Sequence, residues 1–292
     1  MVLGVPNFSE GRDRRRIEDI SGAFATGAAL LDLHSDPVHN RSVATLSAPP
    51  AELATALANG AWSCVNWIDM RKHDGAHPCI GALDVCPVVW LREEDRDAAD
   101  EAALTAARRI GSDLQVPIFL YGDLATHESH RERAFFRAGG LIELTRRVNS
   151  GELRPDFGPR KVHDKAGATL VTARPPLAAF NVELADGDIL VARAVAARLR
   201  ESGGGLLGVR AIGVDLGDGR GQISANVHDP VAVPLATVVE RVRELAAPHG
   251  ARPAAAEIVG LIPERALEGW DDQIPLEGFD PAKQLIERRV RI

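Results

Sequence analysis

Short apolar or alternating runs and longer alanine-rich stretches follow one another along the first half of the chain. Period-two alternation or a short apolar run predicts a strand, and apolar residues at every third or fourth position predict a helix. Strands are therefore expected at residues 1–5, 28–34, 41–47, 82–90 and 116–121. Helices are expected at 11–25, 51–68, 94–112 and 127–148. The first six elements have the order of a split βαβ unit.

The second half of the chain shows the same alternation. We expect a hairpin at 168–173 and 177–184, a helix at 187–201, a hairpin at 206–216 and 221–227, a helix at 234–247 and a strand at 256–261. Hairpins joined by crossover helices favour antiparallel sheets. The pattern thus predicts an α+β fold with two ferredoxin-like (split βαβ) subdomains, mostly antiparallel sheets and helices packed on one face. We place the subdomains at 1–175 and 176–292.

Composition narrows the classes of partner. The 292 residues are 45% hydrophobic, which is enough for a substantial core, and the net charge is −7. Lys and Arg number 34 against 41 Asp and Glu, so we expect no nucleic-acid partner. A membrane-spanning helix needs about 18 consecutive apolar residues, and no apolar run in the sequence is that long. We therefore expect no membrane association.

The cysteines and the N-terminus predict the cellular location. Cys64, Cys79 and Cys86 are odd in number and lack a repeating spacing, unlike the framework of a secreted disulfide protein. The N-terminus has no basic start followed by an apolar stretch, as a signal peptide would. We therefore expect a cytoplasmic protein with reduced thiols.

The segment HDGAHPCIGALDVCP, residues 73–87, is the strongest candidate for chemistry. Pro78 disfavours a helix at His77, and Gly75 and Gly81 permit tight backbone paths, so His77 is expected in a turn before a buried strand. A histidine there can exchange a proton near neutral pH. Asp84 could orient its imidazole, or be a buried carboxylate satisfied by backbone amides.

A zinc site is a competing interpretation of the same segment. His73, His77, Cys79 and Cys86 have suitable donor atoms, but the two cysteines are farther apart than in most structural zinc sites. Cys86, in an apolar strand, is better explained as a small core residue. We therefore expect no metal.

Two further pairs of residues each allow a structural and a functional interpretation. Asn7 and Ser9 precede a predicted helix, where they could cap it or help to bind an anion. Asn40 and Arg41 follow a hairpin turn, where they could be a turn residue and a solvated charge, or could bind a carboxylate. The sequence pattern leaves these alternatives open.

Nine segments, in this order, resemble the formiminotransferase domain of the formiminotransferase-cyclodeaminase family. They are VPNFSEGRD (5–13), LLDLHSDPVHNRSV (30–43), IDMRKHDGAHPCIGALDVCP (68–87), VPIFLYGDLA (116–125), RPDFGP (154–159), GATLVTAR (167–174), AAFNVEL (178–184), QISANV (222–227) and EIVGLIPERAL (257–267). They span nearly the whole chain. We expect the family's second activity, that of a cyclodeaminase, to be absent here.

The resemblance implies transfer of a formimino group from N-formimino-L-glutamate to N5 of tetrahydrofolate in histidine degradation. His77 falls on the family's catalytic histidine and would be the general acid and base. Tetrahydrofolate would be a co-substrate, and the partners would be small molecules. The family also implies a homodimer. Expected substrate- or folate-binding residues are Asn7, Ser9, His34, Asn40, Arg41, Cys79, Gly81, Asp84, Lys165 and Arg174.

Two positions depart from the pattern of animal members. Asp32-Leu33-His34 stands where they read Asp-x-Asp, and His77-Pro78-Cys79 stands where they read His-Pro-Arg. Each change removes a charged group that could position substrate or tune His77. Two alternatives therefore stay open, a related folate-dependent one-carbon (formyl) transferase and a non-catalytic folate-binding protein.

Overall fold

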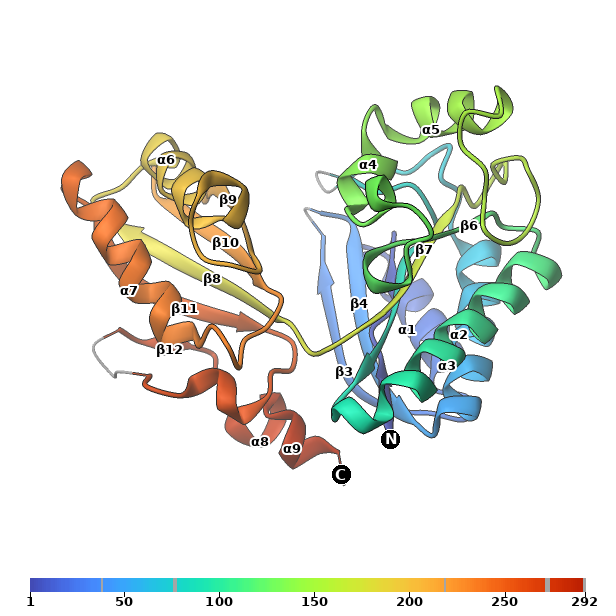
Figure 1. Ribbon diagram of the computed structural model, residues 1–292, viewed down its shortest axis with the longest axis horizontal. Coiled ribbons are helices and arrows are strands. Elements are labelled where there is room, and N and C mark those ends of the chain that lie inside the picture. Colours follow the sequence, from blue (N-terminus) through green and yellow to red (C-terminus); the bar gives the residue numbers. More distant parts are fainter. Residues whose placement is uncertain (38, 76–77, 218, 271–273, 291–292) are drawn as a thin grey trace. The chain divides into compact units, whose positions relative to one another are not determined.

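The structure is a computed structural model, and it describes residues 1–37, 39–75, 78–217, 219–270 and 274–290 (Figure 1). The chain divides into two compact units, Met1–Arg174 and Pro175–Ile292, here called unit 1 and unit 2. Each unit has its own β-sheet and its own apolar core. The α+β fold of two subdomains predicted from the sequence is confirmed.

The sheet of unit 1 combines antiparallel and parallel pairing. Its antiparallel part consists of β3 (Ala29–Asp36), β4 (Arg41–Ala48), β1 (Val2–Gly4) with β2 (Asn7–Phe8), and β5 (Leu83–Trp90), in that spatial order. Beyond β5 lie β7 (Thr169–Arg174) and β6 (Ile118–Leu120), both paired in parallel. The strands from β1 to β5 therefore have the ferredoxin-like order.

Three helices cover one face of this sheet, namely α1 (Arg14–Phe24), α2 (Pro50–Trp67) and α3 (Arg96–Asp113) (Figure 1). The Asp13 carboxylate caps α1 by accepting hydrogen bonds from the N–H groups of Arg15 and Arg16. Phe24 of α1 packs so closely on α2 that a Cβ at Gly60 would lie 1.9 Å from its ring. A glycine is therefore required where these two helices meet.

A second helical layer lies on the other face of the unit 1 sheet. There α4 (Arg133–Arg137) and α5 (Gly140–Asn149) bury Phe136, Leu144 and Val148 against strand residues that include Phe119. The prediction of helices on one face did not include this layer. The single helix predicted at 127–148 is also wrong, because Gly139 and Gly140 have φ values of 73° and 68°, in the left-handed region that ends a helix.

The hairpin predicted at 168–173 and 177–184 is wrong as well. Strand β7 lies between β5 and β6 in the first sheet, whereas β8 (Ala178–Ala185) belongs to the second sheet. Pro175 and Pro176 separate the two strands. Because proline has no N–H to donate, two successive prolines cannot continue a hairpin ladder.

Unit 2 is a five-stranded sheet in the order β12 (Leu276–Glu277), β11 (Arg252–Val259), β8, β10 (Gly221–Val227) and β9 (Val209–Asp215). The pairings of β8 with β10 and β11, and of β9 with β10, are antiparallel, and that of β11 with β12 is parallel. Helices α6 (Ile189–Leu199) and α7 (Leu235–Ala246) contribute to the apolar core of this unit. The central strands again follow the ferredoxin-like order.

The C-terminal part differs most from the predicted elements. Strand β11 begins at Arg252 and ends at Val259, whereas the pattern predicts residues 256–261. Its first half contains Pro253 and a run of alanines, which have low β-propensity, so the pattern there is weak. The short helices α8 (Pro281–Gln284) and α9 (Ile286–Arg289) have too few residues to give a period.

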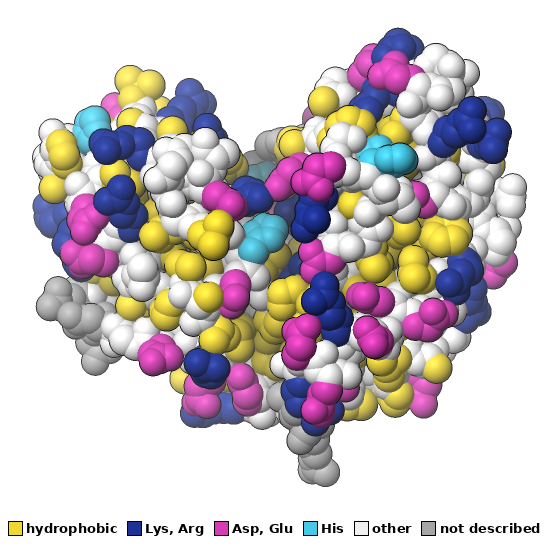
Figure 2. Space-filling view, in the orientation of Figure 1, with side chains coloured by type: hydrophobic (Ala, Val, Ile, Leu, Met, Phe, Trp, Pro, Cys, Tyr) yellow, Lys and Arg dark blue, Asp and Glu magenta, His cyan; other side chains and the backbone are white. Residues whose placement is uncertain are grey.

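The surface shows no segregation of charge on the face seen in Figure 2, where acidic and basic side chains are interspersed. Within the part of the chain that the structure describes, no helix is both long enough and apolar enough to cross a membrane.

Candidate active site

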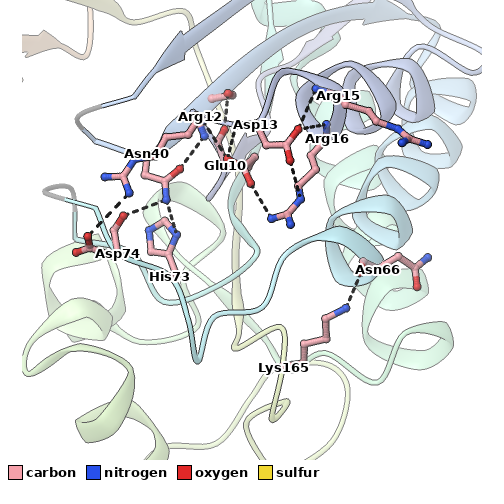
Figure 3. A network of polar contacts seen from close by, with 12 residues as sticks. Glu10, Arg12, Asp13, Arg15, Arg16, Asn40, Asn66, His73, Asp74 and Lys165 are labelled. Carbon is pink, nitrogen blue, oxygen red and sulfur yellow. Dashed lines mark hydrogen bonds and ion pairs between the residues drawn. The ribbon is translucent and has the colours of Figure 1, made fainter.

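Asn40 links three segments of unit 1 at one end of its sheet. The Asn40 side chain accepts a hydrogen bond from the N–H of Gly11, in the loop after β2, at 2.9 Å. It donates to the carbonyl of Asp74, at 3.0 Å, and lies 3.4 Å from Nδ1 of His73, both in the loop before β5 (Figure 3). Asn40 itself has a φ of 48°, a conformation that asparagine tolerates well. Asn40 therefore has a clear structural function, whatever it binds.

The buried carboxylate of Glu10 stabilises the loop after β2 through hydrogen bonds and an ion pair. The Glu10 side chain is only 9% exposed. One carboxylate oxygen accepts from the N–H groups of Arg12 and Asp13, each at 3.0 Å, and the other forms an ion pair with Arg16 at 3.3 Å (Figure 3). Ser42 of β4 donates to the Glu10 carbonyl at 2.6 Å. Sequence reasoning missed Glu10, although an acidic residue just before a helix was a usable signal.

Asn7 and Arg41 form a second polar contact in the same region. The Arg41 guanidinium, at the start of β4, donates to Oδ1 of Asn7, whose Nδ2 donates to the carbonyl of Val5 at 2.7 Å. Burial lowers the pKa of Arg41 to about 10, with Asp84 acting in the opposite direction. Arg41 is therefore still a cation at neutral pH, held partly out of water. Asn7 is thus occupied with positioning it.

Ser9 and Gly81 fix the segment that leads into β5. The Ser9 hydroxyl donates to the carbonyl of Gly81 at 2.7 Å, and the Ser9 N–H donates to the carbonyl of Ala82 at 2.9 Å. Gly81 also approaches the chain before β7, where a Cβ would lie 1.8 Å from the carbonyl oxygen of Ala168. Gly81 is therefore a close-packing position, where only glycine fits.

Cys79 is a partly buried thiol beside this segment. Burial raises its pKa, as does the nearby Asp84, while a hydrogen bond with Ser9 and the charge of Arg137 act in the opposite direction. The thiol is therefore protonated at neutral pH. A protonated thiol is a poor nucleophile and a poor metal ligand.

Asp84, the second residue of β5, is 1% exposed and makes two strong contacts. One carboxylate oxygen accepts from the N–H of Ile80 at 2.8 Å, and the other accepts from the guanidinium of Arg137 in α4. The alternative in which Asp84 is a buried carboxylate satisfied by backbone amides is thus correct for one oxygen. Arg137 was missed because nothing in its local sequence distinguishes it from a solvated helix charge.

His77 itself lies outside the described residues. Its described neighbours on both sides belong to the cluster above. On one side His73 and Asp74 contact Asn40, and on the other side the N–H of Ile80 donates to Asp84. The described residues on both sides of the predicted acid and base are therefore anchored by side chains from the loop after β2, the turn between β3 and β4, β5 and α4.

The three remaining predicted residues lie in different places. His34 is exposed on β3, where it pairs with Val43, and Val43 in turn pairs with Asn7, so all three lie on one face of the sheet. Lys165 donates to the carbonyl of Asn66, near the end of α2, at 2.6 Å (Figure 3). Arg174 ends β7, and burial lowers its pKa to about 10.

The zinc interpretation gains no support from the cysteines. Cys86 lies fully buried in the apolar core, where burial raises its pKa to about 12. Among the residues that the structure describes, no three or more His, Cys, Asp or Glu side chains gather as metal ligands would. His77, the remaining member of that proposed set, is outside those residues.

Comparison with known proteins identifies the family. Residues 1–174 match the model of the formiminotransferase domain, N-terminal subdomain, and residues 179–270 match that of the formiminotransferase domain. The chain therefore belongs to the formiminotransferase family.

Several named relatives resemble the chain over most of its length. A glutamate formimidoyltransferase of Streptococcus pyogenes is 36% identical over 99% of this chain and 98% of its own length. One from Thermoplasma acidophilum is 35% identical over 99% and 97%. The formimidoyltransferase-cyclodeaminase of Rattus norvegicus is 36% identical over 91% of this chain but only 51% of its own.

Proposed function

We propose that this protein is a glutamate formimidoyltransferase, which transfers the formimino group of N-formimino-L-glutamate to N5 of tetrahydrofolate in histidine degradation. The observation that carries the proposal is the similarity, over almost the full length of both chains, to two proteins with that name, at 36% and 35% identity. Tetrahydrofolate is then a co-substrate, and the reaction itself calls for no metal.

The chemistry needs one group that moves a proton. N5 of tetrahydrofolate attacks the imino carbon of the donor and forms a tetrahedral intermediate. The bond from that carbon to the glutamate nitrogen then breaks, and glutamate leaves as an amine. The proton lost by N5 is the one that the leaving nitrogen gains. We assign both transfers to His77, because an imidazole titrates near neutral pH and can accept and return the same proton.

Other residues then bind or position the substrates. Arg41 and Arg174 are partly buried cations suited to carboxylates. Asp84 positions Ile80, three residues after His77 in the sequence, by accepting its N–H. The remaining residues that we assign to the substrate and folate sites are Asn7, Ser9, His34, Asn40, Cys79, Gly81 and Lys165.

We further propose that the protein acts in the cytoplasm as a homodimer. All three cysteines are free thiols, as expected in a reducing compartment. Sedimentation equilibrium of the purified protein tests the dimer, and a monomer at micromolar concentration would contradict it.

A formyl donor is the second candidate. The observation that favours it is Cys79, a partly buried thiol without the charged donor groups of a guanidinium, at a position where animal family members have arginine. An assay of the purified protein with tetrahydrofolate and either formimino- or formylglutamate separates the candidates. Transfer from the formimino donor is expected. Transfer from the formyl donor alone would establish the second function, and tetrahydrofolate binding without transfer from either donor would indicate a binding protein.

A further inference from the structure

Helix α4 presents two arginines that sequence reasoning did not select. Arg133 and Arg137 are four residues apart, so they lie on the same face of the helix, one turn apart. Arg137 donates to Asp84 of β5. Arg133 has its guanidinium carbon 5.9 Å from the centroid of the Tyr121 ring, beyond the end of β6. One side chain therefore reaches Asp84 of the candidate site, and the other reaches Tyr121.

Positive charge exceeds negative charge around these two residues. Arg41 lies close enough to both for their charges to lower its pKa, and Asp84 is the carboxylate that raises it. Arg174 is likewise influenced by Arg133. Among the described residues, Arg133 forms no ion pair with any carboxylate. Several guanidinium groups thus share a partly buried region in which Asp84 supplies the negative charge.

Arg137 also has an unused donor. Its side chain is 14% exposed, and its Nε atom is buried without a hydrogen-bond acceptor in the part of the chain that the structure describes. Buried donors nearly always have a partner. Like charges held out of water also favour an anion beside them. An anionic ligand would meet both requirements, and a carboxylate matches the planar donor geometry of a guanidinium.

We propose that Arg133 and Arg137, together with Arg41, bind a carboxylate of the glutamyl moiety that a substrate of this enzyme carries. The proposal rests on the proposed function, because both formiminoglutamate and the tail of tetrahydrofolate contain such a moiety. Arg133 recognises the carboxylate directly, and Arg137 does so while it also holds Asp84. Helix α4 thereby becomes part of the substrate site, although Arg137 and Asp84 are 53 residues apart in the sequence.

The test variant is Arg133→Gln, because this change breaks no ion pair with a described residue. Arg133→Lys, which keeps the positive charge, is the conservative variant. Arg131→Gln, which removes an exposed charge paired with Asp123 at 3.5 Å, is the matched control. The Michaelis constants for both substrates and kcat are measured for all three. Arg133→Gln is expected to raise one Michaelis constant about tenfold or more, with a much smaller change in kcat and partial recovery in Arg133→Lys.

The affected substrate identifies the source of the carboxylate. A rise for formiminoglutamate alone assigns the site to the donor. A rise for tetrahydrofolate alone, with unchanged binding of pteroic acid, which lacks the glutamyl tail, assigns it to the folate. Equal Michaelis constants in Arg133→Gln and Arg131→Gln would overturn the proposal.

A binding measurement separates this proposal from the proposed function. Calorimetric titration of the unaltered protein, Arg133→Gln and Arg131→Gln with L-glutamate and with folic acid does not depend on turnover. If the protein transfers no group, weaker binding of either ligand to Arg133→Gln than to Arg131→Gln would still support the carboxylate site. Unchanged binding of both ligands would overturn it. A matching thermal unfolding curve for Arg133→Gln shows that the variant is folded.

Discussion

The guanidinium of Arg137, in α4, donates a hydrogen bond to the carboxylate of Asp84, in β5. This contact joins the second helical layer of unit 1 to the strand that follows the His77 segment. The other oxygen of Asp84 accepts from the N–H of Ile80, so the same carboxylate fixes the end of that segment. One buried ion pair therefore connects α4 to the described residues directly before β5.

Removal of the Asp84 carboxylate should destabilise the protein strongly. Asp84→Ala leaves Arg137 buried without its partner and leaves the N–H of Ile80 without its acceptor. The loss of one partner of a buried ion pair costs about 3–5 kcal/mol. Urea-induced unfolding measures the change in the free energy of unfolding.

An exposed ion pair in the same unit is the control for this measurement. Arg14 and Glu18 are 2.8 Å apart on α1, with side chains 91% and 61% exposed. Glu18→Ala should cost less than about 1 kcal/mol. A loss for Asp84→Ala as small as that for Glu18→Ala would show that the pair does not hold the loop.

Gly81→Ala should disrupt the packing of the segment before β5. The added Cβ would lie 1.8 Å from the carbonyl oxygen of Ala168, which is backbone and cannot rotate away. The hydrogen bond from the N–H of Ala168 to the carbonyl of Ile80, at 2.9 Å, would also have to shift. We expect a loss of roughly 3 kcal/mol or more, at the upper end of the cost of overpacking.

Gly22→Ala is the matched control, because nothing lies within 4 Å of its added Cβ and Gly22 is a helical residue in the last turn of α1. This change should raise the free energy of unfolding by up to about 1 kcal/mol, since alanine favours a helix over glycine. Thermal unfolding of both variants tests the pair of predictions. A Gly81→Ala variant as stable as the unaltered protein would refute the close approach of Gly81 and Ala168.

His130 should make the stability of the protein depend on pH. The His130 ring lies 5.0 Å from the ring of Phe135 and 5.2 Å from that of Phe136. Burial lowers the pKa of His130 below 6.5. The charges of His127 and Arg147 also lower this pKa, and the charge of Asp156 raises it. Below pH 6.5 the imidazole of His130 therefore binds a proton more readily in the unfolded chain than in the folded chain. The contribution of His130 to stability is complete above that pH and is lost as the pH falls.

Urea midpoints at pH 8 and pH 5.5 measure this effect. The decrease in midpoint on acidification should be smaller in His130→Phe than in the unaltered protein, because phenylalanine does not titrate. His249→Gln, which alters an exposed histidine of unit 2, should leave the decrease unchanged. An equal decrease in His130→Phe and the unaltered protein would assign the pH dependence to other groups.

Sequence periodicity correctly predicted the helices whose own residues show a regular repeat of apolar positions. The helices α1, α2, α3, α6 and α7 all follow a regular apolar repeat, and each was predicted near its observed bounds. The pairing of β7 could not be found in this way. Its partners β5 and β6 are distant in sequence, whereas β8 follows after a short link, and local order alone favours a hairpin.

In the candidate site, too, residues in recognisable sequence segments could be predicted, whereas a contact between residues far apart in the sequence could not. Asn7, Arg41 and Asp84 lie in the segments that carry the family resemblance, so they could be selected from the sequence. Arg137 reaches Asp84 across 53 residues, from a short helix between two irregular segments. Nothing in its neighbourhood indicates a buried partner, because arginine on a helix is usually solvated.

The rate of formimino transfer by the unaltered protein and by His77→Ala, with tetrahydrofolate binding measured for both, tests the central claim most directly. His249→Ala, an exposed histidine, is the matched control. We predict transfer by the unaltered protein and by the control, and a loss of about 100-fold or more in His77→Ala while tetrahydrofolate still binds. An undiminished rate in His77→Ala, or no transfer by an unaltered protein that binds tetrahydrofolate, would contradict the account.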